Sequence, residues 1–177
     1  IRDGFSYGDY LRRGAIARFA NIMDSVQEYA ANGGKVLGIC NGFQILLEAG
    51  LLPGAMKRND SLHFISKYHT LKVVNTDNTF LSLLNKDDVL NIPVAHHDGN
   101  YYIDANGLKE LEDNNQILLK YCDKDGNLVN MNGSISNIAG ICNKQKNVFG
   151  LMPHPERAIE TILGSTDGVN MLKGFLQ

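Results

Sequence analysis

Apolar and polar residues follow two different periods along this chain, and these periods predict its secondary structure. Between residues 10 and 31 apolar side chains recur every three or four positions, which is typical of an amphipathic helix. Shorter apolar runs bounded by glycine, asparagine or proline are typical of strands. We expect helices over 10–31, 41–49, 104–114 and 166–176, a helical turn over 80–84, and strands over 35–39, 62–74, 89–95, 117–121, 135–142 and 148–152. This mixture predicts an α/β protein with a parallel-type core sheet and some antiparallel additions.

Length, charge and cysteine content narrow the class of protein. The 177 residues suit one domain over 1–177, and the net charge of −2 without a basic cluster argues against nucleic-acid binding. No apolar run approaches the roughly 18 residues that span a membrane. The three cysteines, Cys40, Cys122 and Cys142, are an odd number without C-x-x-C spacing. They therefore predict neither a disulfide framework nor a structural zinc site, and they favour the reducing cytoplasm.

The segment Gly38-Ile39-Cys40-Asn41-Gly42 carries the strongest chemical signal. It lies between a predicted strand and a predicted helix, and its glycines permit a sharp turn and close approach of other backbone. A thiol at a helix N-terminus is favoured as a thiolate, which is the nucleophilic form. Most isolated cysteines are small buried apolar residues, and we expect that role for Cys122 and Cys142. The glycines around Cys40 argue against such a purely structural role for that cysteine.

A second signal, Pro153-His154-Pro155-Glu156, follows the predicted strand 148–152. Pro155 favours extended backbone at His154, which would put His154 and Glu156 on one side of the chain. Glu156 could then orient the imidazole of a catalytic base. A prolyl turn with a surface glutamate is the alternative. Cys40 and His154 both follow apolar strands, and parallel sheets gather active groups at the carboxyl ends of strands, so we predict a Cys-His-Glu triad.

Two loops complete the candidate site. The glycine-rich segment that contains Gly4 and Phe5 could aim backbone N–H groups at a developing negative charge and, with the Asn41 N–H, form an oxyanion hole. The cluster His96-His97-Asp98 resembles a metal site only superficially, because adjacent strand side chains diverge and no further ligands stand at suitable spacing. We expect it to be a loop beside the active site.

These motifs resemble those of the class I (triad) glutamine amidotransferases. Within that family the chain is similar, over essentially its whole length, to the glutaminase subunits of phosphoribosylformylglycinamidine synthase. The matching segments are Gly4-Phe5-Ser6-Tyr7-Gly8-Asp9, Cys40-Asn41-Gly42-Phe43-Gln44, Ile92-Pro93-Val94-Ala95-His96, Asn132-Gly133-Ser134 and Met152-Pro153-His154-Pro155-Glu156.

The resemblance implies a flavodoxin-like three-layer sandwich with a mostly parallel central sheet. It implies that Cys40 attacks the side-chain amide of glutamine, that His154 transfers protons and that Glu156 orients His154. It also implies oxyanion or substrate-binding roles for a further set of residues, namely Gly4, Phe5, Asn41, Gln44 and His96. The glutaminase would carry no metal or organic cofactor.

The implied partners are glutamine, an ATP- and magnesium-dependent synthetase that receives the ammonia in purine biosynthesis, and a small bridging subunit. Nucleic acid and membrane are not among them.

The chain also departs from the family. It begins at Ile1 without the usual leading strand-helix-strand, so we expect an N-terminally incomplete domain, and Arg2 and Asp3 stand where the family has Pro-Gly. Two alternatives therefore stay open. One is a non-catalytic subunit that docks on the same synthetase, and the other is a different Cys-His-acid α/β hydrolase, such as a dienelactone-hydrolase-like protein.

Overall fold

The computed structural model describes Ile1 and residues 21–177. The predicted helix over 10–31 is described from residue 21 onward, and its earlier part lies outside the described residues. The α-helices are α2 (Ile22–Ala31), α3 (Asn41–Glu48), α4 (Ala105–Asp113) and α5 (Gly168–Leu176). The strands are β1 (Val36–Ile39), β2 (Ala55–Lys57), β3 (Ile65–Val73), β4 (Val89–His96), β5 (Asn100–Tyr102), β6 (Ile117–Cys122), β7 (Ile138–Cys142) and β8 (Val148–Leu151). Residues 21–177 also contain three short 3₁₀ helices, η1 (Ile135–Asn137), η2 (Pro155–Arg157) and η3 (Thr161–Leu163).

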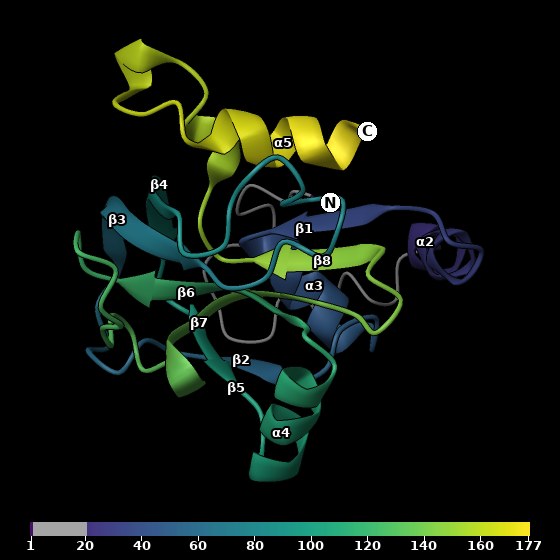
Figure 1. Cartoon of the computed structure of the whole chain (residues 1–177). Helices are drawn as coiled ribbons and strands as arrows, with labels where there is room; N and C mark the ends of the chain where they lie inside the picture. Colours follow the sequence, from purple (N-terminus) through teal and green to yellow (C-terminus); the bar gives the residue numbers. More distant parts are fainter. Residues whose placement is uncertain (2–20) are drawn as a thin grey trace.

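Six strands form one mixed sheet in the order β1-β8-β7-β6-β3-β4, and β2 pairs with β5 in a separate two-stranded sheet (Figure 1). Among the strands that the structure describes in this sheet, only β1 and β8 pair in parallel, and the other four pairings are antiparallel. The expectation of a mostly parallel sheet is met only at β1 and β8. Antiparallel neighbours can be joined by short turns, as β7 and β8 are, whereas parallel neighbours need a long crossover.

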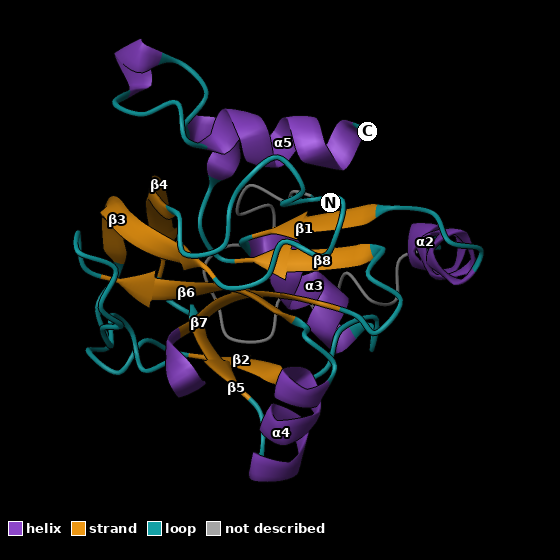
Figure 2. Ribbon diagram, in the orientation of Figure 1, coloured by secondary structure: helices purple, strands orange, loops and turns teal. Residues whose placement is uncertain are grey.

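The parallel pair β1–β8 lies between two helices, with α3 on one face and α5 on the other (Figure 2). Successive residues of a strand face opposite sides of the sheet, and β8 shows this directly. Phe149 packs at 6.2 Å between ring centroids on Phe175 of α5. The next residue, Gly150, faces the ring of Phe43 in α3. This sandwich fixes the start of α3, and therefore Cys40, relative to the end of β8.

The predicted strand over 135–142 begins later than expected. Its first three residues form η1, in which Ser136 and Asn137 have positive φ values of 51° and 57°. Asparagine tolerates this region better than most residues do, and the apolar residues on either side gave no sign of the turn. The short strands β2 and β5 were not predicted, because three residues with mixed polarity carry no periodic signal.

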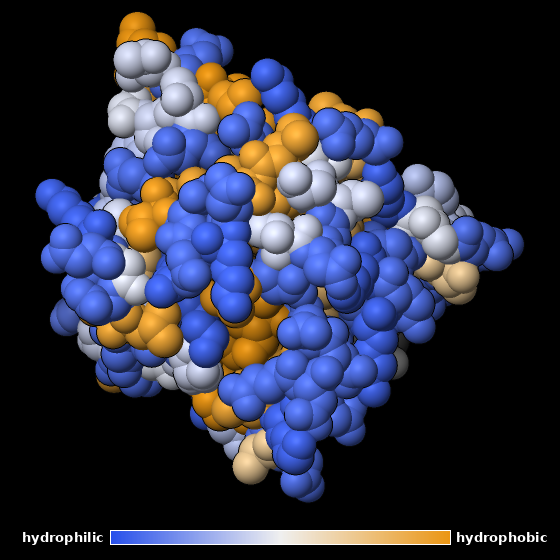
Figure 3. Space-filling view, in the orientation of Figure 1, coloured by the Kyte–Doolittle hydropathy of each residue, from blue (hydrophilic) through white to orange (hydrophobic). Residues whose placement is uncertain are grey.

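The surface in Figure 3 is largely polar, with apolar side chains at the projecting η3 segment. Ile162 is 89% exposed there. Among the helices that the structure describes, none combines the length and apolar character that a membrane span requires.

Candidate active site

Cys40 occupies a sharp turn between β1 and α3. Its backbone has φ 52° and ψ −109°, an unusual conformation for a residue with a side chain. Backbone N–H groups of Phe43 and Gln44 both donate to its carbonyl oxygen, at 2.9 and 3.2 Å, and close the first turn of α3. A Cβ at Gly38 would lie only 2.7 Å from the Gly42 carbonyl oxygen. The predicted strand-turn-helix is confirmed, and the turn needs glycine at position 38.

His154 follows β8, and its Nδ1 lies 2.8 Å from Glu156 Oε1. A carboxylate oxygen only accepts, so Nδ1 donates, and in the neutral ring Nε2 carries the lone pair. Nε2 is buried and has no hydrogen-bond partner in the part of the chain that the structure describes. Arg157 Nε lies 3.7 Å from the same Glu156 oxygen and supports its negative charge. The prediction of extended backbone after His154 is wrong, because residues 155–157 form the 3₁₀ helix η2. The side chains of His154 and Glu156 nevertheless lie within hydrogen-bond distance.

Cys40 and His154 are held against the same two strands. The Cys40 backbone N–H donates to Leu151 O at 2.8 Å, at the end of β8. The His154 backbone N–H donates to Pro93 O of β4 at 2.8 Å. The thiol of Cys40 contacts the carbonyl oxygen of Ala95, also in β4, at 3.7 Å. Cys40, His154 and the end of β4 therefore share one small region.

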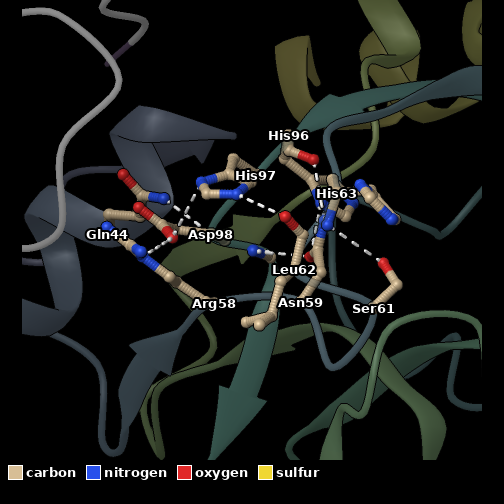
Figure 4. A network of polar contacts seen from close by, with 10 residues as sticks. Gln44, Arg58, Asn59, Ser61, Leu62, His63, His96, His97 and Asp98 are labelled. Atoms are coloured by element: carbon tan, nitrogen blue, oxygen red, sulfur yellow. Dashed lines mark hydrogen bonds and ion pairs between the residues drawn. The ribbon is translucent and has the colours of Figure 1, made fainter.

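The loop after β4 closes over the start of α3 (Figure 4). Gln44 Nε2 donates to the carbonyl oxygen of Asp98 at 2.7 Å. The Asp98 carboxylate is buried, with Arg58 Nε and His97 Nδ1 each 3.7 Å from its Oδ1. Gln44 was predicted as a site residue, whereas Arg58 and Asp98 were not given a role. A buried carboxylate beside an arginine suits the charged groups of an amino acid substrate.

His96 ends β4 and is only 2% exposed. Burial, and to a smaller extent the nearby His154, lower the pKa of His96 to about 4. Its Nδ1 lies 3.0 Å from Oδ1 of Asn59, a residue that is completely buried. Asn59 was missed because it stands in the polar run Arg58-Asn59-Asp60, which is typical of a surface turn.

The structure describes some of the remaining predicted site residues and cysteines but not all of them. Asn41 is the first residue of α3, is 5% exposed, and its side-chain amide has no hydrogen-bond partner within residues 21–177. Gly4 and Phe5 lie outside the described residues. Cys122 and Cys142 are fully buried free thiols, and burial raises the pKa of Cys142 to about 11. The prediction that both are small buried apolar residues is therefore confirmed.

In the described residues no group of three or more histidine, cysteine, aspartate or glutamate side chains could hold a metal ion. The cluster His96-His97-Asp98 is engaged in internal contacts. His97 Nε2 lies 3.0 Å from Leu62 O, and His96 contacts Asn59.

Comparisons with known proteins identify the family of this chain. A CobB/CobQ-like glutamine amidotransferase domain matches residues 1–170. The phosphoribosylformylglycinamidine synthase subunit PurQ of Sulfurimonas denitrificans is 70% identical over 177 residues, which are 100% of this chain and 79% of that protein. The protein of the same name from Wolinella succinogenes is 63% identical over 175 residues, 99% of this chain and 78% of that protein.

Solved structures give the same result. The structure of PurLQS from Thermotoga maritima matches with a TM-score of 0.85 at 42% identity, covering 98% of this chain and 76% of that one. The glutaminase domain of Trypanosoma brucei CTPS matches with a TM-score of 0.58 at 11% identity over 96% of this chain and 69% of that one, and this likeness supports the fold alone. From its sequence and its fold together, the chain belongs to the CobB/CobQ-like glutamine amidotransferases.

Proposed function

We propose that this chain is the glutaminase subunit of a phosphoribosylformylglycinamidine synthase and hydrolyses glutamine to glutamate and ammonia through Cys40, His154 and Glu156. The observation that carries the proposal is the Cys40 turn at the end of β1, beside the His154–Glu156 pair at the end of the neighbouring β8. The likeness to PurQ subunits at 70% and 63% identity supports the choice of this glutaminase within the family.

The proposed reaction proceeds through a thioester. Cys40 Sγ attacks the carboxamide carbon of glutamine while the thiol proton passes to His154 Nε2, and Glu156 stabilises the resulting imidazolium. The C–N bond then breaks, and His154 returns the proton to the leaving nitrogen, so ammonia departs. Water attacks the thioester with His154 as base, which releases glutamate and restores the thiol. This chemistry needs no metal or organic cofactor on the glutaminase.

The substrate and oxyanion contacts are also part of the proposal. Asn41 offers its backbone N–H at the start of α3, where helical N–H groups lack intrahelical partners. Gly4 and Phe5 would supply the second side of the oxyanion hole. Gln44, with the Asp98 carboxylate and Arg58 behind it, would hold the amino acid end of glutamine.

The ammonia would pass to a partner subunit rather than to solvent. A synthetase that uses ATP and magnesium would consume it in purine biosynthesis, with a small third subunit bridging the two. The likeness to the PurLQS structure from Thermotoga maritima supports an assembly of this kind. We place the reaction in the cytoplasm, in keeping with three cysteines that form no disulfide bond among the described residues.

The test is glutamate release from glutamine by the full-length protein, alone and with its synthetase. Cys40→Ser should abolish release while the protein stays folded and bound to the partner, because only the nucleophile changes. Glu156→Gln should lower kcat by about 10- to 100-fold, since a hydrogen bond to a charged group is replaced by a neutral one. A folded wild-type protein that binds the synthetase but releases no glutamate would overturn the proposal in favour of the docking-subunit alternative.

A further inference from the structure

Asn59 connects three segments of the site through its side chain. Its Nδ2 donates to two backbone carbonyl oxygens, those of His63 and His96, both at 2.9 Å. Its Oδ1 accepts the backbone N–H of Gly99 at 3.1 Å. Carbonyl oxygens only accept and backbone N–H groups only donate, so these contacts determine which amide atom is oxygen and which is nitrogen.

This orientation of Asn59 fixes the tautomer of His96. The same Oδ1 lies 3.0 Å from His96 Nδ1 (Figure 4). An amide oxygen cannot donate, so Nδ1 carries the hydrogen. Neutral His96 therefore has a bare Nε2, which can only accept. This nitrogen is buried and lacks a hydrogen-bond partner among the described residues. A buried acceptor without a partner is costly, which points to a ligand that donates to it.

His96 stands beside the reacting groups. The residue before it, Ala95, contacts the Cys40 thiol through its carbonyl oxygen. The backbone N–H of His154 donates to Pro93 O, three residues before His96 on the same strand. A Cβ at Gly99 would lie 2.2 Å from His96 Nδ1, so the ring is packed tightly and cannot turn over freely. The glutamine carboxamide has an NH₂ group with two donors, and this group needs acceptors once the carboxamide oxygen faces the oxyanion donors.

We propose that His96 recognises the carboxamide NH₂ of glutamine through its bare Nε2, and that Asn59 is the positioning residue that keeps this nitrogen bare. The inference rests on the proposed glutaminase function and deepens it. A bare Nε2 attracts the NH₂ of glutamine and repels the corresponding carboxylate oxygen of glutamate. His96 therefore favours the substrate over its own product. The low pKa of His96 is consistent with this role, because the ring stays neutral near pH 7.

The test compares His96→Asn with wild type in the full-length protein bound to its synthetase. Asparagine retains a donor near the former Nδ1 position but ends short of Nε2. We expect the KM for glutamine to rise about tenfold, the worth of one hydrogen bond. The inhibition constant for glutamate should stay at its wild-type value or fall. Equal weakening of glutamine and glutamate would show a merely structural role and overturn the inference.

A second measurement does not depend on the folding of that variant. In ¹⁵N NMR of histidine-labelled wild-type protein, His96 Nδ1 should have the shift of a protonated ring nitrogen and Nε2 that of a bare one. Asn59→Ala should give a mixture of both tautomers. A proton on Nε2 in wild type would refute the assignment. Absence of Cys40-dependent glutamate release would instead refute the glutaminase function, so the two failures are distinct.

Discussion

Gly150 of β8 decides how closely α3, and with it Cys40, can approach the sheet. A Cβ added there would lie 2.2 Å from Cδ2 of Phe43 and 2.6 Å from Cδ1 of Leu52. Both side chains are almost fully buried, at 0% and 2% exposure, so neither can swing into solvent. We predict that Gly150→Ala pushes α3 away from β8 and moves Cys40 away from His154.

The size of the effect follows from overpacking. Extra atoms in a close-packed core cost ~1–3 kcal/mol. For a chain of this length that corresponds to a melting temperature lowered by about 3–10 °C. Glutamate release should fall as well, because a displacement near 1 Å at a reacting atom can reduce the rate about 100-fold. Thermal unfolding followed by circular dichroism, together with the glutaminase assay, measures both.

Gly140→Ala in β7 is the matched control. Gly140 is also buried, but its added Cβ would meet Leu151 Cβ at 3.0 Å and Gly150 O at 3.1 Å, a conflict that small shifts can relieve. The double variant Gly150→Ala with Phe43→Leu should lose less stability than the sum of the two single variants, since leucine makes room for the new methyl group. Strict additivity, or a Gly150→Ala protein that melts and reacts like wild type, would refute the reasoning.

Other predictions concern reactivity, stability and pH. Iodoacetamide at pH 8 should alkylate Cys40 and spare Cys142, because a thiol with a pKa of about 11 is ~0.1% ionised at that pH. Peptide mass spectrometry would show which cysteines are alkylated, and alkylation of Cys142 would contradict the prediction. Asn59→Ala should lower stability by ~2–4 kcal/mol, since it leaves buried carbonyl and N–H groups without partners, whereas Asn127→Ala on the surface should change little in urea unfolding. The pKa of His96 is lowered to about 4 in the folded state, whereas the unfolded chain takes up this proton near pH ~6.5. The free energy of unfolding is therefore unaffected by this group above pH ~6.5 and falls by up to ~3 kcal/mol as the pH falls toward 4. His96→Asn should flatten that part of the stability profile, and an unchanged slope would sink the prediction.

The sequence predicted the local part of the site better than its surroundings. A strand, a cysteine between glycines and a helix are close together in the chain, and local sequence specifies such a turn. The pair His154 and Glu156 is also local, and it formed although η2 replaced the extended backbone. Asn59 is different, because its bond to His96 spans 37 residues and depends on the packing of two loops. The residues next to Asn59 in the sequence show no pattern from which this distant contact could be predicted.

Strand direction was the main error in the fold, and its cause is physical. An apolar run indicates that a strand is buried, but it does not identify the neighbour or its direction. The run over 138–142 reads equally well as a parallel core strand, yet β7 lies antiparallel to both β6 and β8. Direction depends on connections, and the turn over 143–147, where Asn143 Oδ1 accepts the N–H groups of Asn147 and Val148, can only join antiparallel strands.

The two histidines of the site illustrate how the acceptor at Nδ1 determines what an imidazole can do. Both donate through Nδ1 and keep Nε2 as an acceptor, but His154 donates to a carboxylate and His96 to an amide oxygen. A carboxylate stabilises an imidazolium, which suits the group that takes and returns a proton. An amide oxygen orients the ring without stabilising a cation to the same extent, which suits a group that must stay neutral in order to accept a hydrogen bond. Asn59→Asp would remove this difference, because a carboxylate would favour an imidazolium at His96, and Nε2 of His96 would then donate to carboxylates instead of accepting from carboxamides. We therefore expect that variant to bind glutamate more tightly than wild type does and glutamine less tightly, which an inhibition assay at constant pH can measure.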